Sequence, residues 1–229
     1  MTTGLPLIVT RPDPGGAATV DRAKALGLDV HHMPLFAAKP LPWTPPATLD
    51  FDALLVTSAQ AARPAGPDLA RLASLPVYAV GAATAAAVET AGLRVEMTGA
   101  TDGQDLLGAM TSRKIRNILW LCARDRSAFD TLGAALVPLP CYAVDAIAPP
   151  PGWATTIAAP AVLAAHSVRG AARIGELVGA SRGHLGLAAI SPKVAAAAGT
   201  DWAEVVVAER PDDAALLAQA HALCHKGQK

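Results

Sequence analysis

Short apolar runs alternate along the chain with longer stretches rich in Ala, and this pattern predicts strands followed by helices. The helices are expected in segments such as 15–26, 84–91 and 102–110. Strand and helix in alternation are typical of right-handed βαβ units, which build parallel sheets with helices on both faces. The predicted strands are residues 7–9, 30–36, 53–56, 77–80, 95–97, 118–122, 141–147, 161–165, 185–190 and 205–208.

An internal repeat indicates that two halves of the chain have the same organisation. Residues 55–62 correspond to residues 164–171, and residues 79–86 correspond to residues 189–196. Other matches, such as Asp102 with Asp212, keep the same shift of 109 or 110 residues. A period of this length is typical of a duplicated domain rather than of a solenoid unit.

The repeat predicts two similar doubly wound lobes of the flavodoxin or Rossmann type, each with a parallel sheet. The opening strand–helix–strand unit precedes the first copy, and we expect it to join the sheet of the C-terminal copy. Lobe A then comprises residues 1–33 and 148–229, and lobe B comprises residues 39–138. Residues 34–38 and 139–147 form a two-stranded β linker, and the working site is expected in a cleft between the lobes.

Composition supports a folded, neutral protein. Hydrophobic residues make up 52% of the chain, and its 19 basic and 19 acidic residues cancel. A neutral balance gives no reason to expect a nucleic-acid or membrane partner. The longest uncharged run, residues 146–168, contains four prolines and predicts a linker, a short helix and a buried strand rather than a membrane span. With no targeting segment visible, we expect a cytoplasmic location.

The usual cofactor and metal motifs are missing from the sequence. No GxGxxG follows a strand and no GxxxxGK[ST] loop is present, which argues against a dinucleotide or P-loop site. The three cysteines form no CxxC pair and are expected to be reduced packing residues. His221 and His225 have i,i+4 spacing but no third ligand nearby, and His166-Ser167 lacks the GxSxG context of a nucleophile.

Small polar residues follow several predicted strands, where an open α/β sheet binds its ligands. Simple helix capping explains any one of these turns. Taken together, the helix N-termini indicate a site for carboxylates or phosphates. The turns are Thr10-Arg11-Pro12, Thr57-Ser58, Gly81-Ala82-Ala83-Thr84, Arg124-Asp125-Arg126-Ser127, His166-Ser167 and Ser191-Pro192-Lys193.

The order of these segments resembles the uroporphyrinogen-III synthase family over nearly the whole chain. The resemblance is carried by residues 9–12, 33–35, 53–59, 77–85, 118–121, 141–144 and 189–195. It implies a cofactor-independent hydro-lyase of haem biosynthesis. The enzyme would close a linear hydroxymethylbilane to uroporphyrinogen III, with inversion of ring D and loss of water.

The resemblance also suggests which residues bind the carboxylates of this substrate. Arg11 is the first candidate for a direct contact, and Thr84 matches the family's threonine after the glycine turn. Ser58, Ser167 and Ser191 match turns whose backbone N–H groups would bind carboxylates. Arg124, Arg126 and Lys193 would add positive charge, and the alternative for each of them is a solvated surface residue. We expect a monomer, with a transient contact to the preceding deaminase as a candidate protein partner.

The chain departs from the family pattern in ways that leave the catalytic acid unassigned. Trp153 stands where some members place a tyrosine, and neither Tyr78 nor Tyr142 replaces it. Ala123 stands where many members have glycine, and Lys193 and Val194 stand where many have threonine. These departures keep open a non-catalytic bilobal sensor of tetrapyrroles or other anions. A two-lobed enzyme acting on a phosphorylated or nucleotide ligand is a second alternative, although no phosphate motif supports it.

Overall fold

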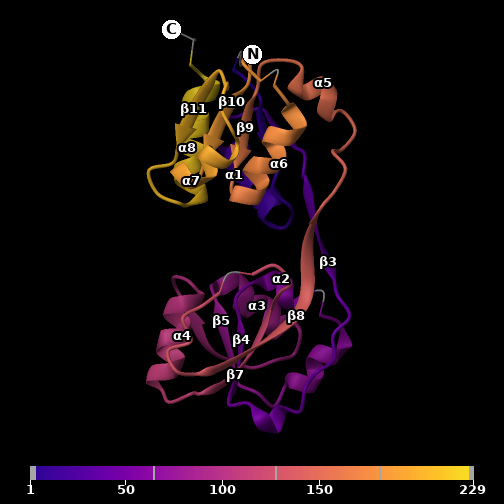
Figure 1. Cartoon of the computed structure of the whole chain (residues 1–229), viewed down its shortest axis with the longest axis vertical. Coiled ribbons are helices and arrows are strands. Elements are labelled where there is room, and N and C mark those ends of the chain that lie inside the picture. Colours follow the sequence, from indigo (N-terminus) through magenta and orange to yellow (C-terminus); the bar gives the residue numbers. More distant parts are fainter. Residues whose placement is uncertain (1–3, 64, 127, 181, 227–229) are drawn as a thin grey trace. The chain divides into compact units, whose positions relative to one another are not determined.

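The computed structural model describes residues 4–63, 65–126, 128–180 and 182–226, and the chain divides into two compact units. Unit 1 contains Met1–Ala37 and Ala146–Lys229, whereas unit 2 contains Ala38–Asp145. Each unit has its own α/β architecture (Figure 1). The mixed α/β fold with parallel sheets is therefore confirmed.

Unit 1 is built on a five-stranded parallel sheet with the strand order β11-β10-β9-β1-β2. Because β1 pairs with β9, the opening segment of the chain belongs to the same sheet as its C-terminal part. The strands are β1 (Leu7–Val9), β2 (Val30–His32), β9 (Val162–Ala165), β10 (Gly186–Ala189) and β11 (Glu204–Val207). The helices are α1 (Gly15–Ala25), α5 (Trp153–Ile157), α6 (Val168–Val178), α7 (Pro192–Ala197) and α8 (Asp213–Cys224).

Unit 2 is built on a six-stranded sheet with the order β3-β8-β7-β4-β5-β6. The pairs among β4 to β8 are parallel. The strands are β3 (Phe36–Pro40), β4 (Ala53–Val56), β5 (Val77–Val80), β6 (Val95–Gly99), β7 (Asn117–Ala123) and β8 (Ala135–Ala146). The helices are α2 (Ala59–Ala62), α3 (Ala82–Thr90) and α4 (Gly103–Ser112), with 3-10 turns η1 (Thr48–Asp50) and η2 (Pro67–Leu72).

Each sheet separates two apolar cores, as expected for strands whose two faces are both covered. In unit 1, α5, α6 and α7 pack with one face of the sheet, and α1 and α8 pack with the other. In unit 2, α2, η2 and α3 cover one face, whereas α4 covers part of the other. The small aromatic content is compensated by Ala, Val, Leu and Ile, which fill these cores.

The sheet topology follows the internal repeat. Strands β4, β5 and β6 of unit 2 correspond to β9, β10 and β11 of unit 1, at a shift of 109 residues. The remaining strands β7 and β8 follow this set in unit 2, whereas their counterparts β1 and β2 precede it in unit 1. The two units therefore share one strand order but are circular permutations of each other.

The prediction of a single strand at residues 30–36 is wrong in detail, because β2 ends at His32 and β3 begins at Phe36. The amides of Met33 and Leu35 still bond to the Val9 and Thr10 carbonyls, at 2.9 and 3.0 Å. Pro34 lies between them and has no N–H to donate, so the regular ladder stops at this point.

The strand predicted at 141–147 is also too short, because β8 begins at Ala135. Pro138 and Pro140 precede the predicted strand, and proline is rare inside a strand that has neighbours on both edges. In the structure β3 pairs with the later part of β8, as the Leu41 amide bond to the Cys141 carbonyl shows. The prolines thus lie where one edge of β8 lacks a neighbouring strand, and β8 can accommodate them.

The uncharged run 146–168 includes the short helix α5 and the buried strand β9. Among the described residues, no helix is both long and apolar enough to cross a membrane.

Candidate functional site

Three of the predicted site residues of unit 1 lie at one edge of its sheet. Arg11 follows β1, Ser167 follows β9 and Ser191 follows β10. These strands are parallel neighbours in the order β10-β9-β1, so their carboxyl ends lie side by side. Lys193 lies close to this edge in the first turn of α7 and is exposed.

Unit 2 brings together the other three in the same way. Arg124 follows β7, Ser58 follows β4, and Thr84 lies in the first turn of α3 after β5. The order β7-β4-β5 again makes these strands neighbours. Thr84 is buried at the start of this helix, with 5% of its surface exposed.

The three predicted serines are helix caps. The Ser58 hydroxyl oxygen accepts a hydrogen bond from the Gln60 amide (3.2 Å), Ser167 from the Gly170 amide (3.0 Å) and Ser191 from the Val194 amide (3.4 Å). Each cap satisfies one backbone N–H that the first helical turn leaves without a partner. The capping interpretation is therefore confirmed, while carboxylate binding at the same turns stays a prediction.

Arg124 is held by carboxylates of its own unit. Its Nη2 atom lies 2.9 Å from Asp125 Oδ2 and 2.6 Å from Asp145 Oδ1, and Lys39 also pairs with Asp145. The guanidinium group and Asp125 are exposed and Asp145 is partly exposed, so solvent screens these contacts and they contribute little to stability. A ligand carboxylate would have to share Arg124 with them.

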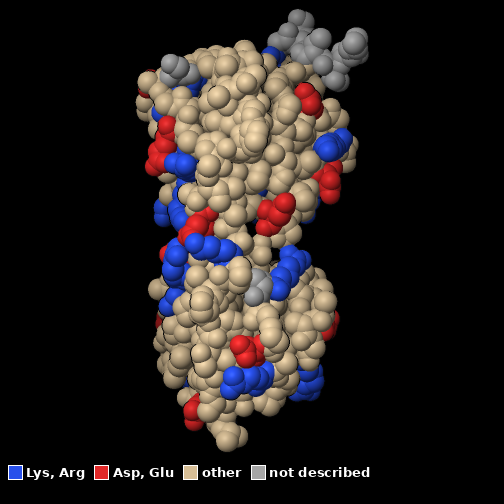
Figure 2. Space-filling view, turned by 90° about the vertical axis from the view of Figure 1, so that its right-hand side faces the viewer, with Lys and Arg blue, Asp and Glu red and all other residues tan. Residues whose placement is uncertain are grey.

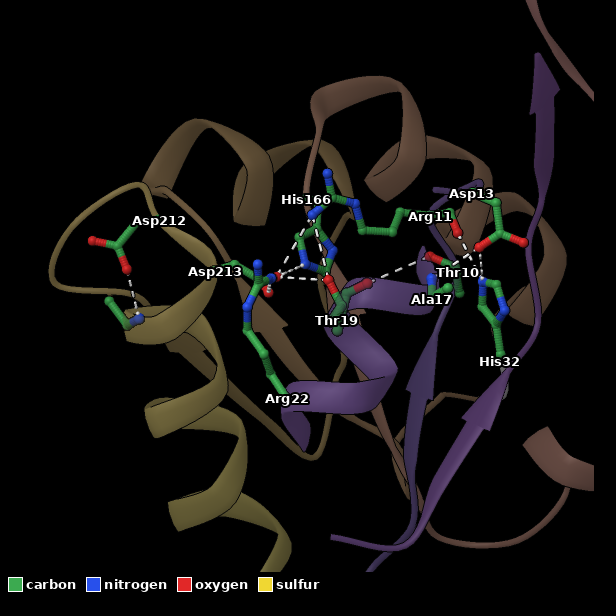
Figure 3. A network of polar contacts seen from close by, with 12 residues as sticks. Thr10, Arg11, Asp13, Ala17, Thr19, Arg22, His32, His166, Asp212 and Asp213 are labelled. Carbon is green, nitrogen blue, oxygen red and sulfur yellow. Dashed lines mark hydrogen bonds and ion pairs between the residues drawn. The ribbon is translucent and has the colours of Figure 1, made fainter. Parts of the chain in front are cut away.

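A partly buried carboxylate connects the polar side chains at the edge of unit 1 (Figure 3). Asp213, the first residue of α8, accepts hydrogen bonds at 2.8 Å from the Thr19 hydroxyl and at 2.5 Å from Arg22 Nη1. Its Oδ1 atom also lies 2.8 Å from His166 Nε2 and 3.6 Å from Arg11 Nη1. One carboxylate thus ties together the end of β1, the end of β9, and helices α1 and α8.

The surroundings of Asp213 keep it ionised. Burial raises the pKa of this carboxyl, but hydrogen bonds from His166, Thr19 and Arg22 outweigh burial and lower it below its ordinary value. The carboxylate also lies in the first turn of α8, where the positive end of the helix dipole favours a negative charge.

His166 is held close to the neutral form. Burial lowers the pKa of its imidazole, and the Asp213 carboxylate only partly opposes this, while the Arg11 charge adds to the lowering. The side chain is 7% exposed, and Nδ1 makes no hydrogen bond of ordinary geometry. A neutral imidazole can donate or accept one proton at the ligand-facing edge of the sheet.

Arg11 lies against the beginning of α1. Its Nη1 atom is 3.4 Å from the Thr19 hydroxyl, and a side chain at Gly15 would come within 2.6 Å of the guanidinium group. At Gly16, an added Cβ would lie 2.2 Å from His32 Nε2 and 2.5 Å from the Arg11 carbonyl oxygen. The Gly15-Gly16 pair therefore permits the close approach of α1 to the end of β1.

Sequence reasoning missed four residues of this network: Thr19, Arg22, His166 and Asp213. The missing GxSxG context argues against His166-Ser167 as a nucleophile and its base, whereas the partner of His166 in the structure is Asp213, 47 positions away. The repeat carried a signal for Asp213, since it pairs this residue with Gly103 of unit 2. A partly buried carboxylate in one copy and a glycine in the other mark a position where the two copies have diverged.

The remaining side chains of interest are buried. Trp153 packs in a core of unit 1, and Tyr142 packs in a core of unit 2 with its hydroxyl hydrogen-bonded to Ser58. Burial raises the pKa of Tyr142. The cysteines are unpaired and buried, and burial raises the pKa of Cys141 to about 12, which keeps this thiol protonated.

The charged side chains of this arrangement suit the binding of an anion. Among the described residues, no group of three His, Cys, Asp or Glu side chains could hold a metal ion. Arg11 and Arg22 carry two positive charges against the one negative charge of Asp213, so a positive charge remains. On the face shown in Figure 2, basic and acidic side chains are interspersed.

The fold and this edge of polar residues define a duplicated α/β protein with a candidate anion-binding edge at the ends of its parallel strands. The family model of uroporphyrinogen-III synthase HemD matches residues 17–218. The chain therefore belongs to the uroporphyrinogen-III synthase family. Membership indicates an enzyme of tetrapyrrole biosynthesis.

Solved structures of similar fold come from two bacteria. Uroporphyrinogen-III synthetase from Helicobacter pylori is 16% identical, with a TM-score of 0.64, and the match covers 96% of this chain and 99% of that one. Uroporphyrinogen-III synthase from Thermus thermophilus is also 16% identical, with a TM-score of 0.38 and coverage of 97% and 98%. At this identity the likeness to the Helicobacter structure concerns the fold. No curated protein matches the sequence.

Proposed function

We propose that the chain closes linear hydroxymethylbilane to uroporphyrinogen III, inverting ring D through a spiro intermediate and releasing water. The observation that carries this proposal is the family match over residues 17–218, which spans both units. In the proposed reaction the terminal hydroxyl leaves with a proton as water, and the first new carbon–carbon bond forms at the substituted α carbon of ring D, which gives the spiro intermediate. The older bond from this carbon to the methylene bridge of ring C then breaks. The released methylene carbon bonds to the free α carbon of ring D, which loses its proton. We propose that the reaction needs no cofactor.

Catalysis in this proposal is mainly a matter of position. Free bilane closes spontaneously without inversion, so the protein has to hold the chain in a conformation that favours attack at the substituted carbon. Positioning of this kind can lower a barrier by about 7–11 kcal/mol at best. The eight carboxylates of the bilane are the groups by which it would be held.

Arg11 is the proposed contact for one substrate carboxylate. Its side chain is 35% exposed, and its ion pair with Asp213 is long at 3.6 Å, so the guanidinium group retains donors for a ligand. Both carboxylate oxygens of Asp213 already accept hydrogen bonds, Oδ1 from Thr19 and Oδ2 from Arg22. The positive charge of Arg11 is therefore only partly compensated by Asp213. Ser167 and Ser191 end the neighbouring strands, and their turns would contribute backbone N–H groups.

The proposal is tested by the isomer that the protein forms. Bilane is generated in situ by a separate deaminase, the products are oxidised, and the porphyrin isomers are separated. We expect mainly the type III isomer. Type I isomer at the spontaneous rate, from protein shown to be folded, would contradict the proposal and favour a sensor without catalytic activity.

A matched pair of variants tests the role of Arg11. Because Arg11→Gln removes one charge-assisted contact, KM for bilane should rise by about tenfold, while the product remains type III. Arg113→Gln serves as the control, since Arg113 is exposed at the end of α4 in unit 2. Equal KM values for Arg11→Gln, Arg113→Gln and the unaltered protein would remove Arg11 from the binding site.

A further inference from the structure

The duplicated units differ at one element. In unit 1, helix α1 connects β1 to β2 and buries Thr19, Val20 and Ala23. In unit 2, the corresponding connection between β7 and β8 forms no helix among its described residues, 124–126 and 128–134. One stretch of the sheet in unit 2 therefore lacks the cover that its counterpart in unit 1 has.

A pocket of about 390 Å³ lies at this place. Its floor comes from β7 and β8, where Trp120 pairs in register with Pro138 and Ile118 pairs with Leu136. The pocket is lined by Trp120, Leu136 and Pro138 from the strands and by Arg124, Arg126 and Ala128 from the connection. Its volume is within the range of small-molecule sites, roughly 300–1,000 Å³.

The indole of Trp120 is fixed in place. Its Nε1 atom donates a hydrogen bond to the Thr57 hydroxyl at 3.2 Å, and its ring lies 4.6 Å from that of Phe129. Gly103 leaves the room for Phe129, because an added Cβ there would lie 2.5 Å from the Phe129 Cζ atom. Unit 2 thus has an aromatic pair where unit 1 has the Asp213 carboxylate.

The pocket carries a net positive charge. The guanidinium of Arg126 lies 5.7 Å from the centre of the Trp120 ring and donates hydrogen bonds to backbone carbonyls. Among the described residues it forms no ion pair with a carboxylate. The positive charges of Arg124 and Lys39 are balanced by ion pairs with Asp125 and Asp145. The positive charge of Arg126 is therefore in excess at this place.

We propose that this pocket of unit 2 binds one carboxylate-bearing pyrrole ring of a linear tetrapyrrole. A flat apolar ring would contact Leu136 and Pro138, and its carboxylate would pair with Arg126, whose planar guanidinium suits a carboxylate. The inference rests on the proposed function for the identity of the ligand. The pocket itself, with its apolar floor and excess positive charge, rests on the structure.

The direct test is a binding measurement by nuclear magnetic resonance on the full chain. The probe is a monopyrrole bearing an acetate and a propionate, and its dimethyl ester is the uncharged control. We expect saturable shifts of the Trp120 indole N–H and of the Ala128 and Leu136 amides, and no such shifts with the ester. The Trp120 signal is assigned by its loss in Trp120→Phe.

Two variants separate the pocket from the rest of the surface. Because one charge-assisted contact is lost, Arg126→Gln should weaken probe binding by about fivefold or more, whereas Arg113→Gln should leave it unchanged. Ala128→Phe should abolish binding by filling the pocket from its exposed rim. Retention of the wild-type affinity in both Arg126→Gln and Ala128→Phe would overturn the proposal.

The outcomes distinguish this inference from the proposed function. Type III product without any probe-induced shift at Trp120 would overturn the pocket assignment and leave the enzymatic function standing. Saturable shifts at Trp120 together with type I product would support the pocket as a site for carboxylated rings and overturn the proposed function.

Discussion

Asp213 is the residue on which the polar contacts of unit 1 converge. The carboxylate is 16% exposed and has four partners from three separate parts of the chain. They are two guanidinium groups, one imidazole and one hydroxyl. Removing one partner from a partly buried cluster of charges lowers the free energy of unfolding, because the remaining charges lose their compensation. Asp213 thus links the stability of unit 1 to the geometry of its candidate site.

Asp213→Asn tests this role. The substitution keeps the shape of the side chain but removes the charge that Arg11, Arg22 and His166 face. We expect the free energy of unfolding at pH 7 to fall by about 2 kcal/mol, measured by urea denaturation. Asp21→Asn, on the exposed face of α1, should change it by less than about 0.5 kcal/mol. Equal effects of the two substitutions would contradict the central place given to Asp213.

His166 predicts a specific dependence of stability on pH. Its pKa is lower in the folded than in the unfolded chain, so the unfolded chain binds more protons as the pH falls through the ordinary histidine value of about 6.5. The contribution of His166 is therefore fully present above that value and is lost towards the lower folded pKa. The free energy of unfolding should decline between about pH 7.5 and 5.5, by at most about 1.4 kcal/mol per unit for this one group.

His166→Asn should flatten this decline, even though it lowers stability overall. The control is His31→Asn, because His31 is exposed on β2. Denaturant midpoints measured across the same pH range compare the slopes. A slope in His166→Asn as steep as in the unaltered protein would show that other groups cause the decline.

At the scale of elements, helix α1 sets unit 1 apart from unit 2. Its first turn approaches the end of β1 closely enough that only glycine fits at residue 16. This contact brings Thr19 and Arg22 to Asp213 and brings the guanidinium of Arg11 next to Gly15. The same stretch of unit 2 has no such helix among its described residues, and a pocket takes its place.

A pair of glycine substitutions tests the packing of α1. Gly16→Ala places a Cβ 2.5 Å from a backbone oxygen, so the helix has to shift, and stability should fall by about 1–3 kcal/mol. Gly108→Ala, inside α4, meets only the Leu132 Cδ1 atom at 3.7 Å and should stabilise the protein by about 0.5–1 kcal/mol, since alanine favours helix. Thermal unfolding compares the two, and equal signs would contradict the close packing at residue 16.

At the scale of the whole molecule, much of the fold was predictable from sequence. Periodicity indicated the strands, and the constant shift between Ser58 and Ser167 or Asp102 and Asp212 indicated a duplication. The break at Pro34 and the extension of β8 through Pro138 were not predictable, because they depend on which neighbour each edge has. The lack of a helix among the described residues 124–126 and 128–134, after β7, was not predicted from the sequence either.

The candidate site was predictable only in part. Arg11 was found because it directly follows a strand in a recognisable motif. The contacts of His166 with Asp213 join residues 47 positions apart and depend on tertiary packing, which no local pattern encodes. Ser58, Ser167 and Ser191 were correctly placed at strand ends, where their observed contacts are those of helix caps.

The most direct test of the proposed function is the isomer ratio as a function of protein concentration. Spontaneous closure of bilane competes with the enzymatic route, so the share of type III isomer should rise with added protein until it dominates the products. A type I product at every concentration of folded protein would contradict the account of this chain as a cyclising synthase.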